Sequence, residues 1–165
     1  MITIPPALVQ RSPTPYAALS ASVAMSELGE VIPSMLDEVA AALATAEIAP
    51  VGPPLIRYRV IDMDGLLQVE NGWPVAELRG APDSLVLDTL PGGTYGAATY
   101  RDVREGVAGN AALLEWGTQQ GLAWDRRDSA DGDVFASRAE FFLAGPEDDP
   151  DPAQWLTEVV IKVVD

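Results

Sequence analysis

The chain has no cysteine and no histidine. These two absences exclude disulfides, thiolate nucleophiles, Ser-His-Asp triads and the common zinc and transition-metal sites. A site for magnesium or calcium would have to consist of carboxylates alone. We therefore expect no cofactor and no bound metal, and any chemistry falls to Asp, Glu, Tyr, Ser, Lys or water.

Basic residues are scarce. The sequence has 10 lysines and arginines against 25 aspartates and glutamates, which gives a formal net charge of −15. Nucleic-acid-binding proteins need a basic face to displace phosphate counterions, and an anionic membrane also attracts basic segments. We expect neither as a partner. The acidic field attracts cations instead, although acidity that only maintains solubility is the alternative.

Long hydrophobic runs are also missing. No apolar run approaches the roughly 18 residues that a membrane-spanning helix needs. The N-terminus lacks the basic and then apolar pattern of a secretory signal. Because 48% of the 165 residues are hydrophobic, the composition fits one globular domain with a substantial core. We expect a cytoplasmic protein of a single domain.

The first quarter of the chain contains an arm, a strand and a helix. Residues 1–12 are apolar but rich in proline, which indicates an irregular arm or a short edge segment. Residues 16–23 alternate weakly, as a strand would. Apolar residues over 28–43 then recur at helical spacing. Ser26 is the expected N-cap, and Pro33 is expected at the first position of the main helix, after a loose first turn.

A hairpin follows this helix. Strands are predicted at 55–62 and 66–75, joined by a turn at 64–65 that contains Asp-Gly. Gly72 and Pro74 near the end of the second strand indicate a bulge or a sheet edge there.

The second half repeats this order. Gly121 suits the residue that follows the C-terminus of the second helix. The predicted elements are strands at 85–90 and 94–101, a helix at about 103–120, a polar loop at 125–134, and strands at 135–143 and 155–164.

The two halves therefore match as a duplication. We predict an α+β fold made of two β-α-β-β units with pseudo-two-fold symmetry, in which an antiparallel sheet carries both helices on one side and leaves a central ligand groove. After the arm, residues 13–165 form one domain. Repeat one covers about 13–76, and repeat two covers about 85–164.

Several short motifs carry a resemblance over about residues 13–164. In this order and spacing they resemble the GyrI-like small-molecule-binding domains, which also serve as effector-binding domains of multidrug-responsive bacterial transcription regulators. No DNA-binding segment is evident before residue 13, so the resemblance implies a stand-alone form. The motifs are Pro15-Tyr16-Ala17, Ala49-Pro50-Val51-Gly52-Pro53-Pro54, Arg57-Tyr58, Val69-Glu70-Asn71-Gly72-Trp73-Pro74-Val75, Gly93-Thr94-Tyr95-Gly96, Glu140-Phe141-Phe142-Leu143 and Leu156-Thr157-Glu158-Val159.

Glu158 is the first candidate for a ligand-binding residue. It lies in an apolar strand, where a carboxylate needs a hydrogen bond, a cation or a proton. Alternation puts Glu158 and Val160 on one face, with Thr157, Val159 and Ile161 packed under the helices. The resemblance implies that this glutamate faces the groove and meets cationic ligands. The alternative is a glutamate on an edge strand, exposed to solvent.

Glu140 and Phe142 share one face of the preceding strand. Paired across the last hairpin, they are expected beside Glu158, which would bring a second carboxylate and a ring to the ligand. The alternative is that Arg138 or Arg57 holds Glu140 in a structural ion pair.

The remaining candidates are aromatic or lie in the first repeat. Tyr58 and Glu70 are the counterparts of Phe142 and Glu158 by their order and spacing. Tyr58 is expected to form a wall of the groove, and Trp116 to form its floor or part of the core. Aromatic rings suit flat or cationic ligands because their faces carry negative potential.

Three functions are compatible with these residues. The first is binding, sequestration or sensing of small lipophilic, aromatic, often cationic molecules. The second is hydrolysis of strained, cyclopropane-bearing electrophiles, with Glu158 and Glu140 as acid and base. The third is interaction with a DNA-handling enzyme through the acidic surface. We expect a binding protein rather than an enzyme, and a protein partner is not identified.

Overall fold

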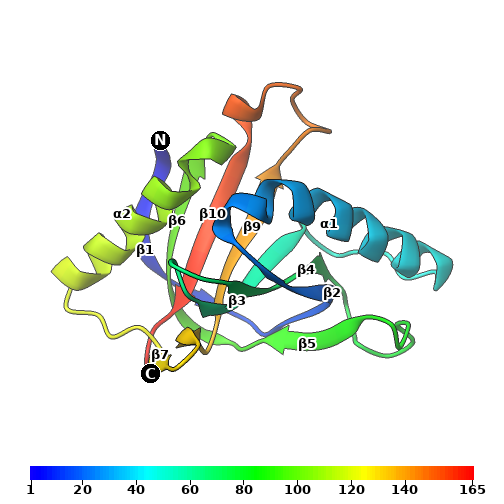
Figure 1. Cartoon of the computed structure of the whole chain (residues 1–165), viewed down its shortest axis with the longest axis horizontal. Helices are drawn as coiled ribbons and strands as arrows, with labels where there is room; N and C mark the ends of the chain where they lie inside the picture. The colour runs from blue at the N-terminus through cyan, green and yellow to red at the C-terminus, as the bar shows by residue number, and fades with distance from the viewer.

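The computed structural model describes all 165 residues as one ten-stranded antiparallel sheet with two α-helices (Figure 1). Short 3-10 turns precede both helices and the last strand. The elements are β1 (Ile2–Arg11), β2 (Thr14–Val23), α1 (Leu28–Thr45), β3 (Leu55–Ile61), β4 (Leu67–Pro74), β5 (Val86–Leu90), β6 (Gly93–Arg101), α2 (Gly106–Gln119), β7 (Arg126–Ser129), β8 (Gly132–Phe135), β9 (Arg138–Ala144) and β10 (Leu156–Lys162).

The strand order follows the predicted duplication. The main path of the sheet is β1-β6-β10-β9-β3-β4-β2-β5. Repeat one (β2-α1-β3-β4) and repeat two (β6-α2-β9-β10) therefore contribute matching halves that meet at β9 and β3. Each repeat is preceded in the chain by one further strand, β1 before the first and β5 before the second. These two leading strands are exchanged, because β1 pairs with β6 of the second repeat while β5 pairs with β2 of the first.

Two forms were expected for the first twelve residues, an irregular arm or a short edge segment, and they take the second. Ten of them form the edge strand β1, which spans nearly the whole length of β6. Pro5 and Pro6 lack an N–H donor, and the register shifts between Ile4 and Ala7, where they lie. An edge strand tolerates both features, because one side of it needs no partner.

Both helices lie on one face of the sheet, as expected. Helix α1 packs on β2 and β4, and α2 packs on β6, β1 and β10, so that the central strands β9 and β3 run between them (Figure 1). Neither helix has the length and apolar character that crossing a membrane requires. The side chains of β9 and β3 that point to this face lie where the two repeats meet.

The opposite, helix-free face has its own core. Tyr16, Leu55, Tyr95, Phe141 and Val160 belong to this cluster, to which side chains of strands from both repeats contribute. The sheet curls around it from both ends. A side chain of β1 contacts β10 and β9, and one of β5 contacts β3, although each pair of elements is separated by intervening strands.

Local details differ from the sequence-based expectations in α1. The helix begins at Leu28, and Pro33 lies inside it as the sixth residue instead of at its start. Ser26 belongs to a preceding 3-10 turn and caps nothing; Glu27 instead accepts a hydrogen bond from the N–H of Ala24. Pro33 leaves the carbonyl of Gly29 without its usual partner, so the first turns of α1 are weakly held.

Two further expectations were wrong. The segment 125–134 was expected to be a loop but contains most of the β7-β8 hairpin, which extends the sheet from β3. Strand β4 has neither a bulge nor an exposed edge at Gly72, because it lies between β2 and β3. A Cβ at Gly72 would lie 1.9 Å from the carbonyl oxygen of Ala17, so the glycine is required by close strand packing.

Candidate functional site

The sheet divides the seven predicted ligand-binding residues into two groups. Glu140, Phe142 and Tyr58 point to the helix side, and Trp116 of α2 lies on the same side; Glu158, Val160 and Glu70 point to the helix-free face. The two groups therefore form separate candidate sites, one on each face of the sheet.

The expected pairing of Glu140 with Glu158 is wrong. In the β9-β10 hairpin Glu140 is opposite Val159, and Glu158 is opposite Phe141. Residues directly opposite each other share a face, so the two glutamates point to opposite sides of the sheet. Hydrolysis by this pair would require one glutamate to act as the acid and the other as the base on the same substrate. Their positions on opposite faces do not allow this.

Glu140 is the centre of a polar cluster on the helix side. Glu140 is only 6% exposed. The hydroxyl of Tyr58 donates to Oε2 at 3.2 Å, and Nδ2 of Asn110 in α2 donates to Oε1 at 2.5 Å. No arginine or lysine forms an ion pair with this carboxylate. Glu140 is thus a buried acid held only by neutral donors.

Burial determines how this cluster ionises. Burial raises the pKa of Glu140, and the hydrogen bonds from Asn110 and Tyr58, together with the positive charge of Arg138, offset only part of that rise. Burial, together with the nearby Glu140, also raises the pKa of Tyr58 and the pKa of Tyr100. Both phenols therefore stay protonated and remain available as donors, whereas the carboxyl group lies in a position that favours its neutral form.

Arg138 approaches Glu140 only through Asn110. Its Nη2 donates to Oδ1 of Asn110 at 2.7 Å, and its guanidinium lies 4.8 Å from the ring centre of Phe135. The alternative in which Arg138 or Arg57 pairs directly with Glu140 is therefore wrong. Arg57 points to the other face, and Arg138 orients the amide that holds the carboxylate.

Apolar and aromatic groups surround the cluster. Tyr58 belongs to the same core cluster as Ile56, and Phe142 packs against it, together with Val31 and Ile32 of α1. These last three side chains are only partly buried. Trp116 packs on the neighbouring cluster under α2, which contains Tyr100 and Leu113. Rings and half-exposed aliphatic groups thus adjoin the buried carboxylate.

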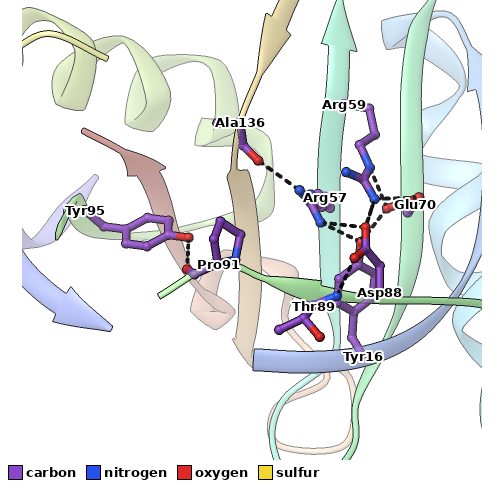
Figure 2. Close-up of polar contacts among 9 residues, drawn as sticks. All are labelled: Tyr16, Arg57, Arg59, Glu70, Asp88, Thr89, Pro91, Tyr95 and Ala136. Atoms are coloured by element: carbon purple, nitrogen blue, oxygen red, sulfur yellow. Dashed lines mark hydrogen bonds and ion pairs between the residues drawn. The ribbon is translucent and has the colours of Figure 1, made fainter. Parts of the chain in front are cut away.

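Glu70 is fully used within a network on the helix-free face (Figure 2). Arg59 donates to both of its oxygens, at 2.9 and 3.2 Å, and the hydroxyl of Tyr16 donates to it at 2.5 Å. Asp88 of β5 accepts from Arg59 and Arg57. Two cations and two carboxylates balance each other here, so the network holds β5 over the curled sheet and leaves no charge for a ligand.

Glu158 also has an internal partner. Nη1 of Arg11 in β1 lies 3.0 Å from its Oε1, and the guanidinium lies 4.6 Å from the ring centre of Phe141. The Glu158 side chain is 23% exposed and borders a shallow, mostly apolar hollow beside β1. Val160 is completely buried in the core of the same face. Neither residue adjoins the Glu140 cluster.

The sequence-based search did not place Tyr100 and Asn110 beside Glu140, and it named Arg138 only as a direct ion-pair partner of that residue. A signal existed for Asn110, which lies three residues before the buried Leu113 and therefore on the apolar face of α2. A polar side chain on such a face usually has a buried partner. Tyr100 gave no comparable signal, since only the register of the sheet brings it to Glu140.

Comparison with known proteins gives matches among solved structures only. No protein-family model matches the sequence, and no curated protein matches it. The C-terminal domain of EcmrR is 14% identical and superposes with a TM-score of 0.72 over 99% of each chain. A hydrolase from Listeria innocua is 13% identical, with a TM-score of 0.63 over 99% of this chain and 94% of that one.

A third match is a structure with a bound ligand. SAV2435 bound to tetraphenylphosphonium is 11% identical and has a TM-score of 0.60, over 96% of this chain and 93% of that one. At these identities the likeness concerns the fold. The chain therefore has the α+β fold of the GyrI-like effector-binding domains, as its sequence motifs indicated.

Proposed function

We propose that this protein binds small lipophilic, aromatic, often cationic molecules on the helix side of the sheet, next to Glu140. One observation carries the proposal: a buried carboxylate held only by neutral donors. An ionised carboxylate in such a place has no cation in direct contact, because Arg138 reaches it only through Asn110, and a ligand cation supplies that contact. Glu70 and Glu158, in contrast, already pair with arginines.

The surroundings of Glu140 favour a lipophilic aromatic cation. The rings of Tyr58 and Phe142 offer faces of negative potential, on which delocalised cations stack. The partly buried Val31 and Ile32 of α1 offer apolar surface that a ligand can cover. The net charge of −15 raises the local concentration of cations around the whole molecule.

The ligand of SAV2435, a domain of the same fold, supports this choice of ligand class. Tetraphenylphosphonium combines one delocalised positive charge with four aromatic rings and has no hydrogen-bonding group. Such a cation is matched by a carboxylate without an ion pair and by aromatic rings, and both are present at Glu140, Tyr58 and Phe142. Binding to this chain is our proposal and awaits measurement.

A fluorescence-anisotropy titration with a cationic rhodamine dye tests the proposal. We expect micromolar binding by the wild-type protein and a loss of tenfold or more in Glu140→Gln, because the charge that faces the ligand is removed. Glu158→Gln is the matched control. It makes the same chemical change on the opposite face and should bind the dye like the wild type.

Two results would contradict the proposal. One is an absence of saturable dye binding by the wild-type protein. The other is a reversed pattern, in which Glu158→Gln loses affinity while Glu140→Gln keeps it, since binding would then occur on the helix-free face.

A further inference from the structure

Asn71 of β4 is a buried polar residue that the site around Glu140 does not use. It is completely buried, and its Oδ1 has no hydrogen-bond partner. Its Nδ2 donates to Sδ of Met35 in α1 at 3.2 Å, and a thioether is a weak acceptor. A buried amide with an unfilled acceptor destabilises the folded state, so its presence calls for a physical explanation.

The register of the sheet aligns Asn71 with Glu140. Ile56 of β3 is opposite Glu140 on one side and opposite Asn71 on the other. The three side chains therefore form a row on the helix side of the sheet. Since neighbouring strands lie about 4.8 Å apart, the Cα atoms of Glu140 and Asn71 are separated by roughly 10 Å.

Met35 is the cover over Asn71. Its side chain is only half buried, and it follows Val31 and Ile32 on the face of α1 that borders Tyr58 and Ile56. Methionine is unbranched and adaptable, so a change of its rotamer uncovers the amide while the helix stays in place. The helix backbone is held independently, because Nε1 of Trp73 donates to the carbonyl of Leu36 at 3.0 Å.

We infer that Asn71 is a second polar anchor of the ligand site, with its carbonyl oxygen as the acceptor. This inference rests on the proposed function and narrows it. The ligand it implies is a lipophilic cation that carries a hydrogen-bond-donating group, such as a carboxamide. This group lies roughly 10 Å from the positive centre, because the strands of Glu140 and Asn71 are two strand spacings apart. Glu140 binds the charge, and Asn71 selects for the donor.

A matched pair of probes tests the inference on the wild-type protein. Both are alkyltriphenylphosphonium cations whose arm is long enough to span the two anchors, and the arm ends either in a carboxamide or in a methyl group. We expect the carboxamide form to bind about five- to tenfold more tightly, the effect of one net hydrogen bond that satisfies a buried acceptor. Isothermal titration calorimetry measures both affinities.

Asn71→Leu is the accompanying variant, of similar volume but without the amide. It should bind both probes with the affinity that the wild type shows for the methyl form, and its Tm should be at least that of the wild type. Equal affinity of the two probes for the wild type, or a preference that survives in Asn71→Leu, overturns the inference and leaves the proposed function standing. A wild type that binds neither probe overturns both.

Discussion

A single side chain, Glu140, carries both the functional claim and a penalty in stability. The sheet and α2 bury its carboxyl group, and only Tyr58 and Asn110 donate to it. In the unfolded chain the same group is hydrated and ionises freely. Its burial is therefore unfavourable at neutral pH, and we attribute its retention to the ligand charge that it can bind.

The pH dependence of stability follows from the direction of this shift. Because burial raises the pKa of Glu140 above its ordinary 4.5, the folded protein binds this proton more tightly than the unfolded chain does. The contribution of Glu140 to the free energy of unfolding is thus fully present below pH 4.5, and it is lost as the pH rises through the pKa of Glu140 in the folded protein.

Glu140→Gln should therefore stabilise the protein at neutral pH. The amide keeps the volume and cannot ionise, so we expect a gain of about 1 kcal/mol, a rise in Tm of a few degrees for a domain of this size. Thermal unfolding of both proteins between acid and neutral pH measures it. The gain should shrink toward acid pH; a gain that does not depend on pH, or a loss at neutral pH, would contradict the description of Glu140.

The sequence did not predict the register in which the strands around Glu140 pair. The motifs around Glu140, Tyr58 and Glu158 identified residues that the structure uses, either in the cluster or in ion pairs. Alternation correctly put Val159 and Ile161 under the helices and Glu158 on the other face, but it could not determine which residue of β9 lies opposite Glu158. That depends on how β9 pairs with β10, and a change of register by one residue moves every side chain to the opposite face.

At the scale of elements, periodicity was a reliable guide wherever a segment carries an apolar stripe. The two helices and the strands of both repeats appear where the spacing of apolar residues put them, and Gly121 has the positive φ of a residue that ends a helix. The failures are β7 and β8, and β1 is longer than the short edge segment that was one of its two expected forms. The segment of β7 and β8 is rich in charge and forms a local hairpin that joins the sheet through β3, while β1 carries prolines and pairs with the distant β6.

Gly72→Ala tests the packing of the central strands. Because a Cβ at this position would lie 1.9 Å from the carbonyl oxygen of Ala17, β4 and β2 would have to separate. We expect a loss of more than about 3 kcal/mol in the free energy of unfolding, measured in urea.

Gly29→Ala is the control for this change. A Cβ on Gly29 meets no atom within 4 Å, and the residue lies in the first turn of α1. Alanine should therefore stabilise the helix by about 0.5–1 kcal/mol. Similar effects of the two substitutions would mean that β4 and β2 are not packed as closely as described.

At the scale of the whole molecule, the duplication explains why the two faces differ in role. The paired helices leave the central strands β9 and β3 between them, where the Glu140 cluster lies (Figure 1). On the other face the exchanged strands β1 and β5 bring Arg11 and Asp88 over the curled sheet. The helix-free face is thus closed by ion pairs and the helix face holds the unpaired acid.

The sequence predicted the two repeats, their order and the common side of the helices. It did not predict the exchange of leading strands, because the pairing of β1 with β6 joins residues that are more than 80 positions apart. No local pattern in residues 1–12 records that partner. The same exchange brings Arg11 to Glu158, which is why the sequence did not indicate this ion pair.

The most direct test of this description is a crystal structure of the protein with tetraphenylphosphonium bound. We expect the cation on the helix side, with its charge beside the Glu140 carboxylate and a phenyl ring against Tyr58 or Phe142, and with the Arg11–Glu158 pair intact. A cation bound instead in the hollow beside Glu158, with Arg11 displaced, would contradict the assignment of the ligand site to the helix face.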